Sequence, residues 1–262
     1  MACGIPDRRK TRAGCGHPRP LCAKSSGSVP GTLGASTRGG QTRQAAFFVN
    51  SYAPLVIRAA GKRAAEEFRL PPFIDGSIRR EPDLEHTCPS ISCLCRAGKF
   101  APRLRIGDVV AYSTKKDRYA EGPPHIRLTA LLRVCEVFDS HTEAAAWYRI
   151  RGHRLPSNCM VRGNQPQPLE HSHRGYAAAS ASDAAFARAW DLSYLERARV
   201  FPRFVLCQLL WRDLSWTAPR LETADLITIF GKVPGTRNPG AWPMSTLDRL
   251  VAHLGLKLAG EP

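Results

Sequence analysis

The clearest pattern along the chain is a pair of apolar runs that predict the centre of a β-sheet. Residues 109–114 follow a turn at Gly107-Asp108, and residues 126–138 form a second run rich in Leu, Val and Ile. Apolar runs of this kind, bounded by turn residues, are typical of buried strands. We therefore expect the two runs to be neighbouring strands of one curved sheet.

Weaker patterns on either side predict further strands at residues 47–52, 204–211 and 226–230, and a short strand or turn within residues 89–95. The pair Pro71-Pro72 favours an extended turn. The polar, Gly- and Pro-containing residues 73–83 then predict a loop that is unusually dense in charge. A second loop, basic in character, is expected between the two central strands.

Helices are predicted where apolar residues recur at helical spacing behind a capping residue. Ser140, with Glu143 three residues later, forms a capping-box pattern for a helix that ends near Gly152. Ser182 precedes a second helix, in which Phe186 and Trp190 share one face. A short helix is expected at 57–68. A final helix opened by Ser245 and Asp248 has a buried stripe of Leu247, Leu250, Val251 and Leu254.

Residues 1–45 differ from the rest of the chain in composition. They hold eight Lys or Arg against the single acid Asp7, and almost no large apolar residues. Such a segment buries too little surface to offset chain entropy, so we expect a disordered basic tail. It is either a basic arm on nucleic acid or an upstream extension without function.

The overall charge favours a polyanionic partner. The 262 residues carry 38 Lys and Arg against 22 Asp and Glu, a formal net charge of +16. Nucleic acid or an anionic membrane fits this charge, although an arginine-rich coding bias also produces it. The nine cysteines are odd in number and irregular in spacing, so no disulfide framework is expected. No apolar stretch is long enough to span a membrane and no secretory signal is evident, so we expect a cytoplasmic protein that does not bind membranes.

The central segment resembles the PUA-like superfamily, which includes the ASCH, EVE and YTH domains. The residues that carry the resemblance are "LRIGDVVAYSTKK…RLTALLRVCEVFDSHTEAAAWY", in which a Gly107-Asp108 turn leads into one strand and a second strand ends at residues 133–137. Within the superfamily the chain is most similar to the nucleotide-modification-associated domains found near DNA-modification genes of phages and bacteria. The segments "PFIDGSIRREPDLE", "CRAGKFAPRL" and "LPSNCMV" support this, and the resemblance covers roughly residues 47–161.

The resemblance implies an α+β fold, a PUA-like small β-barrel with flanking helices and a C-terminal α/β elaboration. We expect three regions: the disordered tail 1–45, the barrel domain 46–175, and an elaboration 176–262 packed on the barrel. In relatives the mouth of the barrel holds a flipped or modified base. Such a pocket needs aromatic or apolar walls and polar groups for the edge of the base.

Two groups of residues are candidates for nucleic-acid binding. The charged loop between residues 75 and 99 offers Arg side chains for phosphate and carboxylates for exocyclic amines. Aromatic residues and one Asn offer stacking and base-edge contacts. The candidate binding residues are Asp75, Arg79, Arg80, Asp83, Arg96, Lys99, Tyr112, Lys115, Trp147, Tyr148 and Asn158. The alternatives without a role in binding are a surface network of mutually paired charges for the first group and a place in the hydrophobic core for Trp147.

The sequence leads us to expect a nucleic-acid-binding module without a cofactor, and it does not indicate an oligomeric state. The alternative is a metal-dependent enzyme acting on nucleotides or nucleic acid through Asp75, Glu81 or Asp83. A zinc site at His86, Cys88, Cys93 and Cys95 has irregular ligand spacing, and we expect buried thiols instead.

The charged loop 75–99 is expected to line the main pocket. In an extended segment neighbouring side chains alternate faces, so Arg79 should face the pocket with Asp75 while Arg80 faces solvent. Pro82-Asp83 begins a nuclease-like pattern, but no acid stands two residues before Lys99 to complete it.

Overall fold

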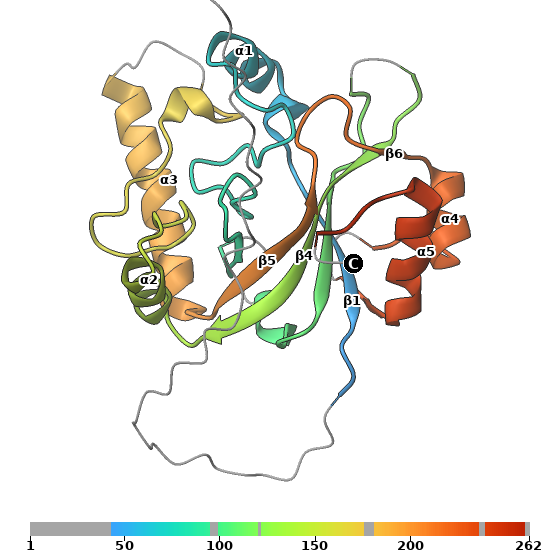
Figure 1. Ribbon diagram of the computed structural model, residues 1–262. Coiled ribbons are helices and arrows are strands. Elements are labelled where there is room, and N and C mark those ends of the chain that lie inside the picture. The colour runs from blue at the N-terminus through green and yellow to red at the C-terminus, as the bar shows by residue number, and fades with distance from the viewer. Residues whose placement is uncertain (1–42, 95–98, 120–121, 176–180, 236–238, 260–262) are drawn as a thin grey trace, which may run out of the picture. The chain divides into compact units, whose positions relative to one another are not determined.

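The computed structural model describes residues 43–94, 99–119, 122–175, 181–235 and 239–259, all within one compact unit that extends from Thr37 to Pro262. These residues form a mixed α+β structure of five α-helices and one seven-stranded sheet (Figure 1). None of the helices among them has both the length and the apolar character needed to cross a membrane.

The sheet has the strand order β2-β5-β4-β3-β1-β7, and β6 pairs with one end of β4. Strands β1 and β3 are parallel, and the other pairs are antiparallel. The expected neighbours, β3 and β4, do pair, which confirms the central prediction. The strands are β1 (Phe47–Tyr52), β2 (Ser90–Ile91), β3 (Val109–Thr114), β4 (Ile126–Phe138), β5 (Phe204–Arg212), β6 (Arg220–Leu221) and β7 (Ala241–Trp242).

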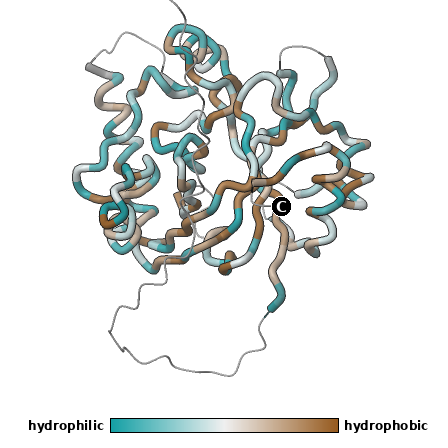
Figure 2. The backbone as a smooth tube through the Cα atoms, viewed as in Figure 1, coloured by the Kyte–Doolittle hydropathy of each residue, from teal (hydrophilic) through white to brown (hydrophobic). Residues whose placement is uncertain are grey.

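Both faces of the sheet are covered, which explains why its central strands are continuous apolar runs rather than alternating ones. Successive residues of one strand point to opposite faces. Phe48 and Val110 therefore pack in one core, while Phe47 and Val109 pack in a second core on the other face. Figure 2 shows the hydrophobic segments along these central strands.

The helices lie on opposite sides of the sheet (Figure 1). Helices α4 (Thr223–Phe230) and α5 (Met244–Leu254) cover the face that carries Phe47. Helices α2 (His141–Ile150) and α3 (Ala181–Val200) lie on the other side, and α1 (Ala59–Glu67) follows β1 after the short 3₁₀ helix η1 (Leu55–Ile57). Two more 3₁₀ helices, η2 (Ala101–Arg103) and η3 (Leu169–His171), lie in the loops.

The capping prediction for α2 is confirmed in its first half. The Ser140 side chain accepts a hydrogen bond from the Glu143 backbone N–H at 3.1 Å. The Glu143 carboxylate accepts a hydrogen bond from the N–H of Asp139, whereas a full capping box would have it accept from the N–H of Ser140. The expected strand at 226–230 is wrong, because that segment is α4, which begins after a capping box at Glu222 and ends at the left-handed Gly231.

A closed barrel is not confirmed. The path of paired strands in the described residues ends at β2 on one side and at β7 on the other, so the sheet is open. The C-terminal region, expected as an elaboration, supplies β5 to the interior of this sheet, where it pairs with β4 and β2. The order of the segments along the chain does not predict this strand order, because β5 pairs with β4 although the two strands lie far apart in the sequence.

The Gly107-Asp108 turn has a structural explanation. Gly107 adopts a φ of +92°, a conformation that residues with a Cβ rarely take. The buried Asp108 carboxylate then accepts hydrogen bonds from the N–H groups of Ala46 and Arg105 and pairs with Arg43 at 2.6 Å. This turn therefore fixes the starts of β1 and β3 side by side.

Candidate functional site

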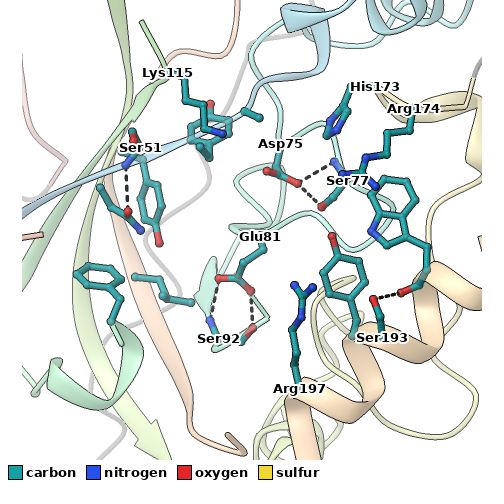
Figure 3. A pocket seen from close by; sticks show the side chains of 18 residues that line it. Ser51, Asp75, Ser77, Glu81, Ser92, Lys115, His173, Arg174, Ser193 and Arg197 are labelled. Carbon is teal, nitrogen blue, oxygen red and sulfur yellow. Dashed lines mark hydrogen bonds between the residues drawn. The ribbon is translucent and has the colours of Figure 1, made fainter. Parts of the chain in front are cut away.

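A cavity of about 560 Å³ lies between the sheet, the loop after Pro72 and helix α3 (Figure 3). We call it the α3 cavity. Its volume is in the range of small-molecule and cofactor sites. The lining residues are Asn50, Ser51, Tyr52, Ala53, Asp75, Ser77, Glu81, Ile91, Ser92, Phe100, Tyr112, Lys115, His173, Arg174, Trp190, Ser193, Tyr194 and Arg197.

The cavity exists because α3 is held away from the sheet. The segment from Phe73 to Leu84 is buried throughout, although it carries five charged residues. Ile78 of this segment packs against Tyr194 and Ala198 of α3, so the loop lies between the helix and the strands. The loop expected on sequence grounds to line the main pocket does contribute to the lining of this cavity, through Asp75, Ser77, Glu81, Ile91 and Ser92. Its residues 73–84 are buried between the helix and the strands and do not form a solvated loop.

The sheet supplies one wall, mainly through residues of the same parity. Asn50 and Tyr52 of β1 point to the cavity side, and Tyr112 of β3 pairs directly with Asn50 in the parallel register. The rings of Tyr52 and Tyr112 meet edge to face with centroids 6.2 Å apart. This wall combines apolar ring surface with polar groups at fixed positions.

Two carboxylates, each bound to a serine, form what we call the floor of the cavity: Asp75, Ser77, Glu81 and Ser92. Asp75 Oδ1 accepts from the Ser77 N–H at 2.9 Å and from the Ser77 hydroxyl. Glu81 Oε1 accepts from the Ser92 N–H at 2.9 Å, and Oε2 accepts from the Ser92 hydroxyl. Figure 3 shows both carboxylates between the strands and α3.

Burial makes the charged forms of these acids costly. It raises the pKa of Glu81 to about 7, against the lowering effect of its Ser92 and Asn158 hydrogen bonds. It also raises the pKa of Asp75, against the lowering effect of Ser77 and of the Arg80 charge. The Asp75 charge contributes further to the rise of the Glu81 pKa. Perturbed acids that share a cavity are typical of functional sites.

Helix α3 supplies the opposite wall with a single face. Trp190, Ser193, Tyr194 and Arg197 are spaced i, i+3, i+4 and i+7, which places them on one side of the helix. The guanidinium of Arg174 lies over the Trp190 ring, 5.0 Å from its centroid. This face therefore presents aromatic surface with a cation at its edge.

Three cations line the cavity beside the two acids: Lys115, Arg174 and Arg197. Arg197 is anchored by a 2.8 Å bond to the Leu94 carbonyl. Burial lowers the pKa of His173 to about 4, with further lowering by nearby cations that include Arg174 and Lys115, so this imidazole is neutral at pH 7. Cationic and anionic groups thus line the same cavity.

Arg79 and Arg80 are both buried, so the expectation that Arg80 faces solvent is wrong. Arg79 makes a two-point bond to Asp191 of α3, with Nε 2.6 Å from Oδ1 and Nη2 2.8 Å from Oδ2. Arg80 donates to the backbone carbonyls of Ser77 and His171 and of Asp75. The segment is not an extended strand, which is why the alternation argument fails here. Neither guanidinium lines the α3 cavity.

The other predicted site residues divide into three groups. Asp75, Tyr112 and Lys115 line the cavity. Asp83, Tyr148 and Asn158 are buried outside it, where Asp83 accepts from the Ser157 N–H, Tyr148 donates to the Cys88 carbonyl and Asn158 bonds to Glu81. Lys99 and Trp147 do not line the cavity, and Arg96 lies outside the described residues.

The zinc candidate falls partly outside the described residues, because Cys95 does. His86 Nδ1 accepts from the Cys88 N–H, so its Nε2 carries the proton and donates to the Arg154 carbonyl at 2.8 Å. Both ring nitrogens are therefore engaged. In the part of the chain that the structure describes, no group of three or more His, Cys, Asp or Glu is placed to hold a metal ion.

Sequence reasoning missed the whole α3 wall and underrated Glu81. The i, i+3, i+4, i+7 pattern of Trp190, Ser193, Tyr194 and Arg197 was available as a signal, but it mixes polar and aromatic types and so does not stand out as a core stripe. Glu81 was one of the carboxylates of the charged loop, and it was given a role of its own only in metal chemistry. Arg174 and His173 had no signal, because they enter the cavity from an irregular loop.

Comparisons of the chain with protein-family models, with curated proteins and with solved structures find no match. The functional argument therefore rests on the geometry and chemistry of the α3 cavity.

Proposed function

We propose that this chain binds nucleic acid and holds one flipped or modified base in the α3 cavity. The observation that carries the proposal is the joint presence of three groups in one cavity: aromatic side chains, buried hydrogen-bonding carboxylates and cations. A base taken out of its stack needs ring surface to replace stacking and polar groups for its edge. Its phosphate needs cations.

The lining residues divide naturally among these roles. Tyr112, Tyr194 and Trp190 offer ring surface, and stacking on an aromatic ring contributes about 1–3 kcal/mol per base. Lys115 and Arg174 offer charge for phosphate. The formal charge of +16 favours association of the whole chain with a polyanion. The resemblance to PUA-like domains agrees with this proposal.

The first test is a binding screen against DNA and RNA oligonucleotides, with and without common base modifications, at several salt concentrations. We expect affinity to fall steeply with salt, because phosphate contacts release counterions. An affinity that does not change with salt would overturn the proposal.

The matched variants are Arg174→Ala in the cavity and Arg188→Ala on the exposed part of α3. Both remove one positive charge, so they affect diffuse attraction equally. Only Arg174→Ala should weaken binding strongly and reduce the salt slope by about 1. Equal losses from both variants would show that the cavity is not the binding site.

A second candidate function is catalysis on nucleotides or nucleic acid. The observation that favours it is the convergence of Asp75 and Glu81 on one cavity, with the pKa of both raised. In the alternative that the sequence suggested, these acids would act with a divalent metal ion. Incubation of nucleotides and oligonucleotides with the protein and Mg²⁺ or Mn²⁺, followed by product analysis, tests it. Product formation that Glu81→Gln abolishes would favour the enzyme over the binding module.

A further inference from the structure

We propose that helix α3 binds unpaired nucleic acid through a row of three aromatic rings, Phe186, Trp190 and Tyr194, so that the base in the α3 cavity is held together with at least one single-stranded neighbour that stacks on Phe186. The inference rests on the proposed function and names its substrate class, a single strand rather than a closed duplex. The spacing, the exposure and the neighbours of the three rings carry it.

The three residues are spaced four apart, so their side chains lie in a row along one side of α3. The ring centroids of Phe186 and Trp190 are 5.8 Å apart, and those of Trp190 and Tyr194 are 6.1 Å apart. We call this row the aromatic ladder. The helix rises about 1.5 Å per residue, so the ladder is about 12 Å long. A stacked strand advances about 3.4 Å per nucleotide, so the ladder is longer than one nucleotide.

The aromatic ladder leads from solvent into the α3 cavity. Its outer ring, Phe186, is 44% exposed, whereas Tyr194 is 4% exposed and lines the cavity together with Trp190. Tyr194 also packs against Ile78 of the buried loop. Core packing therefore accounts for the inner end of the row, but it does not account for an aromatic ring at the exposed end of the same row.

Cations accompany two of the three rings. The guanidinium carbon of Arg174 lies 5.0 Å from the Trp190 ring centroid, and that of Arg197 lies 5.3 Å from the Tyr194 centroid. Figure 3 shows both arginines on the α3 side of the cavity. Among the described residues, the Arg174 side chain has no ion pair and no hydrogen bond, so its donors are available to a phosphate.

Rings combined with cations favour a single strand of nucleic acid. An unpaired base offers its face for stacking and its phosphate for a cation, and every base can stack because each has a π-face. In a duplex each base lies between its neighbours, so a ring reaches it only at an end or after flipping. A neutral ligand that stacks on aromatic rings, such as a polysaccharide, has no charge for Arg174 and Arg197 to meet.

The inner and outer rings of the ladder have different roles. Trp190 and Tyr194 line the cavity, so a single nucleotide contacts them alone. Phe186 does not line the cavity, so only a strand of two or more nucleotides reaches it. The affinity should therefore depend on Phe186 for strands and not for mononucleotides.

The test measures binding of the full chain to single strands of about three and about twelve nucleotides that contain all four bases, a length within the range of known single-strand sites. The same experiment includes a mixture of mononucleotides and a blunt duplex of the longer strand, with all probes made as DNA and as RNA. We expect the longer single strand to bind about tenfold or more tightly than the duplex. Diffuse attraction alone predicts the reverse, because the duplex carries more charge.

Phe186→Leu removes the ring and keeps an apolar side chain. It should lower the affinity for both single strands about fivefold or more and leave the affinity for mononucleotides unchanged. Phe186→Tyr keeps a ring and should bind as the unaltered chain does. Leu192→Ala is the matched control, at a position of α3 that is 54% exposed and outside the ladder, and it should not change the affinity. Equal affinities of Phe186→Leu and Leu192→Ala would overturn the inference.

The two proposals fail in different ways. If binding depends on Arg174 but not on Phe186, or if the duplex binds as tightly as the single strand, the aromatic ladder is overturned and the proposed function stands. If no probe binds in a way that depends on Arg174, the proposed function fails and this inference fails with it.

Discussion

The side-chain nitrogen of Asn158 lies 2.9 Å from Oε2 of Glu81, and its side-chain oxygen accepts from the Ser90 hydroxyl at 2.7 Å. Asn158 is completely buried and does not line the α3 cavity. It was expected to contact the edge of a base. In the structure it is a positioning residue instead, because it donates to the Glu81 carboxylate from outside the cavity.

Replacing Asn158 with Ala should destabilise the fold and disturb the floor. Glu81 Oε2 loses one donor and the Ser90 hydroxyl loses its acceptor, so buried polar groups are left unpaired at about 1–3 kcal/mol. Urea denaturation of Asn158→Ala measures this loss. Thr142→Ala, at an exposed position in α2, is the control and should change the free energy of unfolding by less than about 0.5 kcal/mol. Equal effects of the two variants would contradict the positioning role.

The raised pKa of Glu81 predicts that its contribution to stability falls as pH rises. Its pKa is about 7 in the folded protein against an ordinary value of 4.5, so between these values the folded state holds a proton that the unfolded state has released. Folding is therefore less favourable at the upper end of this window, by about 3 kcal/mol for this group.

Two histidines change the stability with pH in the opposite direction. Burial lowers the pKa of His141 and of His173 to about 4, so their contribution to stability is present above the ordinary pKa of 6.5 and is lost as pH falls toward 4. The difference between the unaltered chain and Glu81→Gln isolates the acid, because both chains keep both histidines. We expect the unfolding free energy of the unaltered chain, relative to Glu81→Gln, to fall between pH 4.5 and pH 8. A flat difference would contradict the raised pKa.

Much of the sheet could be predicted because local pattern determines it. The apolar runs of β3 and β4 and the capping residue Ser140 each carry their signal within a few residues. The error at α4 is instructive, since Leu226, Ile229 and Phe230 are buried at i, i+3 and i+4 while Ile227 is half exposed. That spacing is helical, but the β-branched content of a five-residue run favoured a strand.

The site was harder to predict because its parts are far apart in sequence. The floor at Asp75 and Glu81 meets the α3 wall at Tyr194 only through packing of the intervening loop, as at Ile78. No local pattern specifies that packing. Charge density was also misleading, because the sequence cannot tell a solvated charged loop from one whose Arg side chains are satisfied internally, as Arg79 and Arg80 are.

The buried pair between Arg79 and Asp191 should contribute far more to stability than an exposed pair of the same length. Arg79 Nε lies 2.6 Å from Asp191 Oδ1, and Arg199 Nη1 lies 2.6 Å from Glu196 Oε1, but the Arg79 side chain is 4% exposed while that of Arg199 is 65% exposed. Arg79→Ala leaves a partly buried carboxylate and two backbone carbonyls without a donor. We expect a loss of about 2–4 kcal/mol.

The control for this pair is Arg199→Ala, which should change the unfolding free energy by less than about 0.5 kcal/mol. Arg79→Lys tests geometry, because an ammonium keeps the charge and loses the two-point contact, so only part of the stability should return. Thermal or urea denaturation measures all three variants. A similar small loss for Arg79→Ala and Arg199→Ala would show that the loop does not depend on this link to α3.

Gly76 is required because the His173 ring lies where a side chain would begin. A Cβ at position 76 would stand 2.1 Å from His173 Nδ1 and 2.8 Å from Cγ, so the whole ring would have to move. The backbones are also joined, since the His173 N–H donates to the Gly76 carbonyl at 2.8 Å. Gly76→Ala should therefore destabilise the protein by about 1–3 kcal/mol, as overpacking does.

The double variant Gly76→Ala with His173→Ala should recover part of that loss, because the ring that obstructs the methyl group is gone. The coupling between the two substitutions, measured in a double-mutant cycle by urea denaturation, reports this contact directly. Gly240→Ala is the control, since nothing lies within 4 Å of a Cβ there. It should be neutral or slightly stabilising. Additive losses at Gly76 and His173 would show that the His173 ring does not obstruct a side chain at position 76, and that it does not form the wall of the α3 cavity beside Asp75.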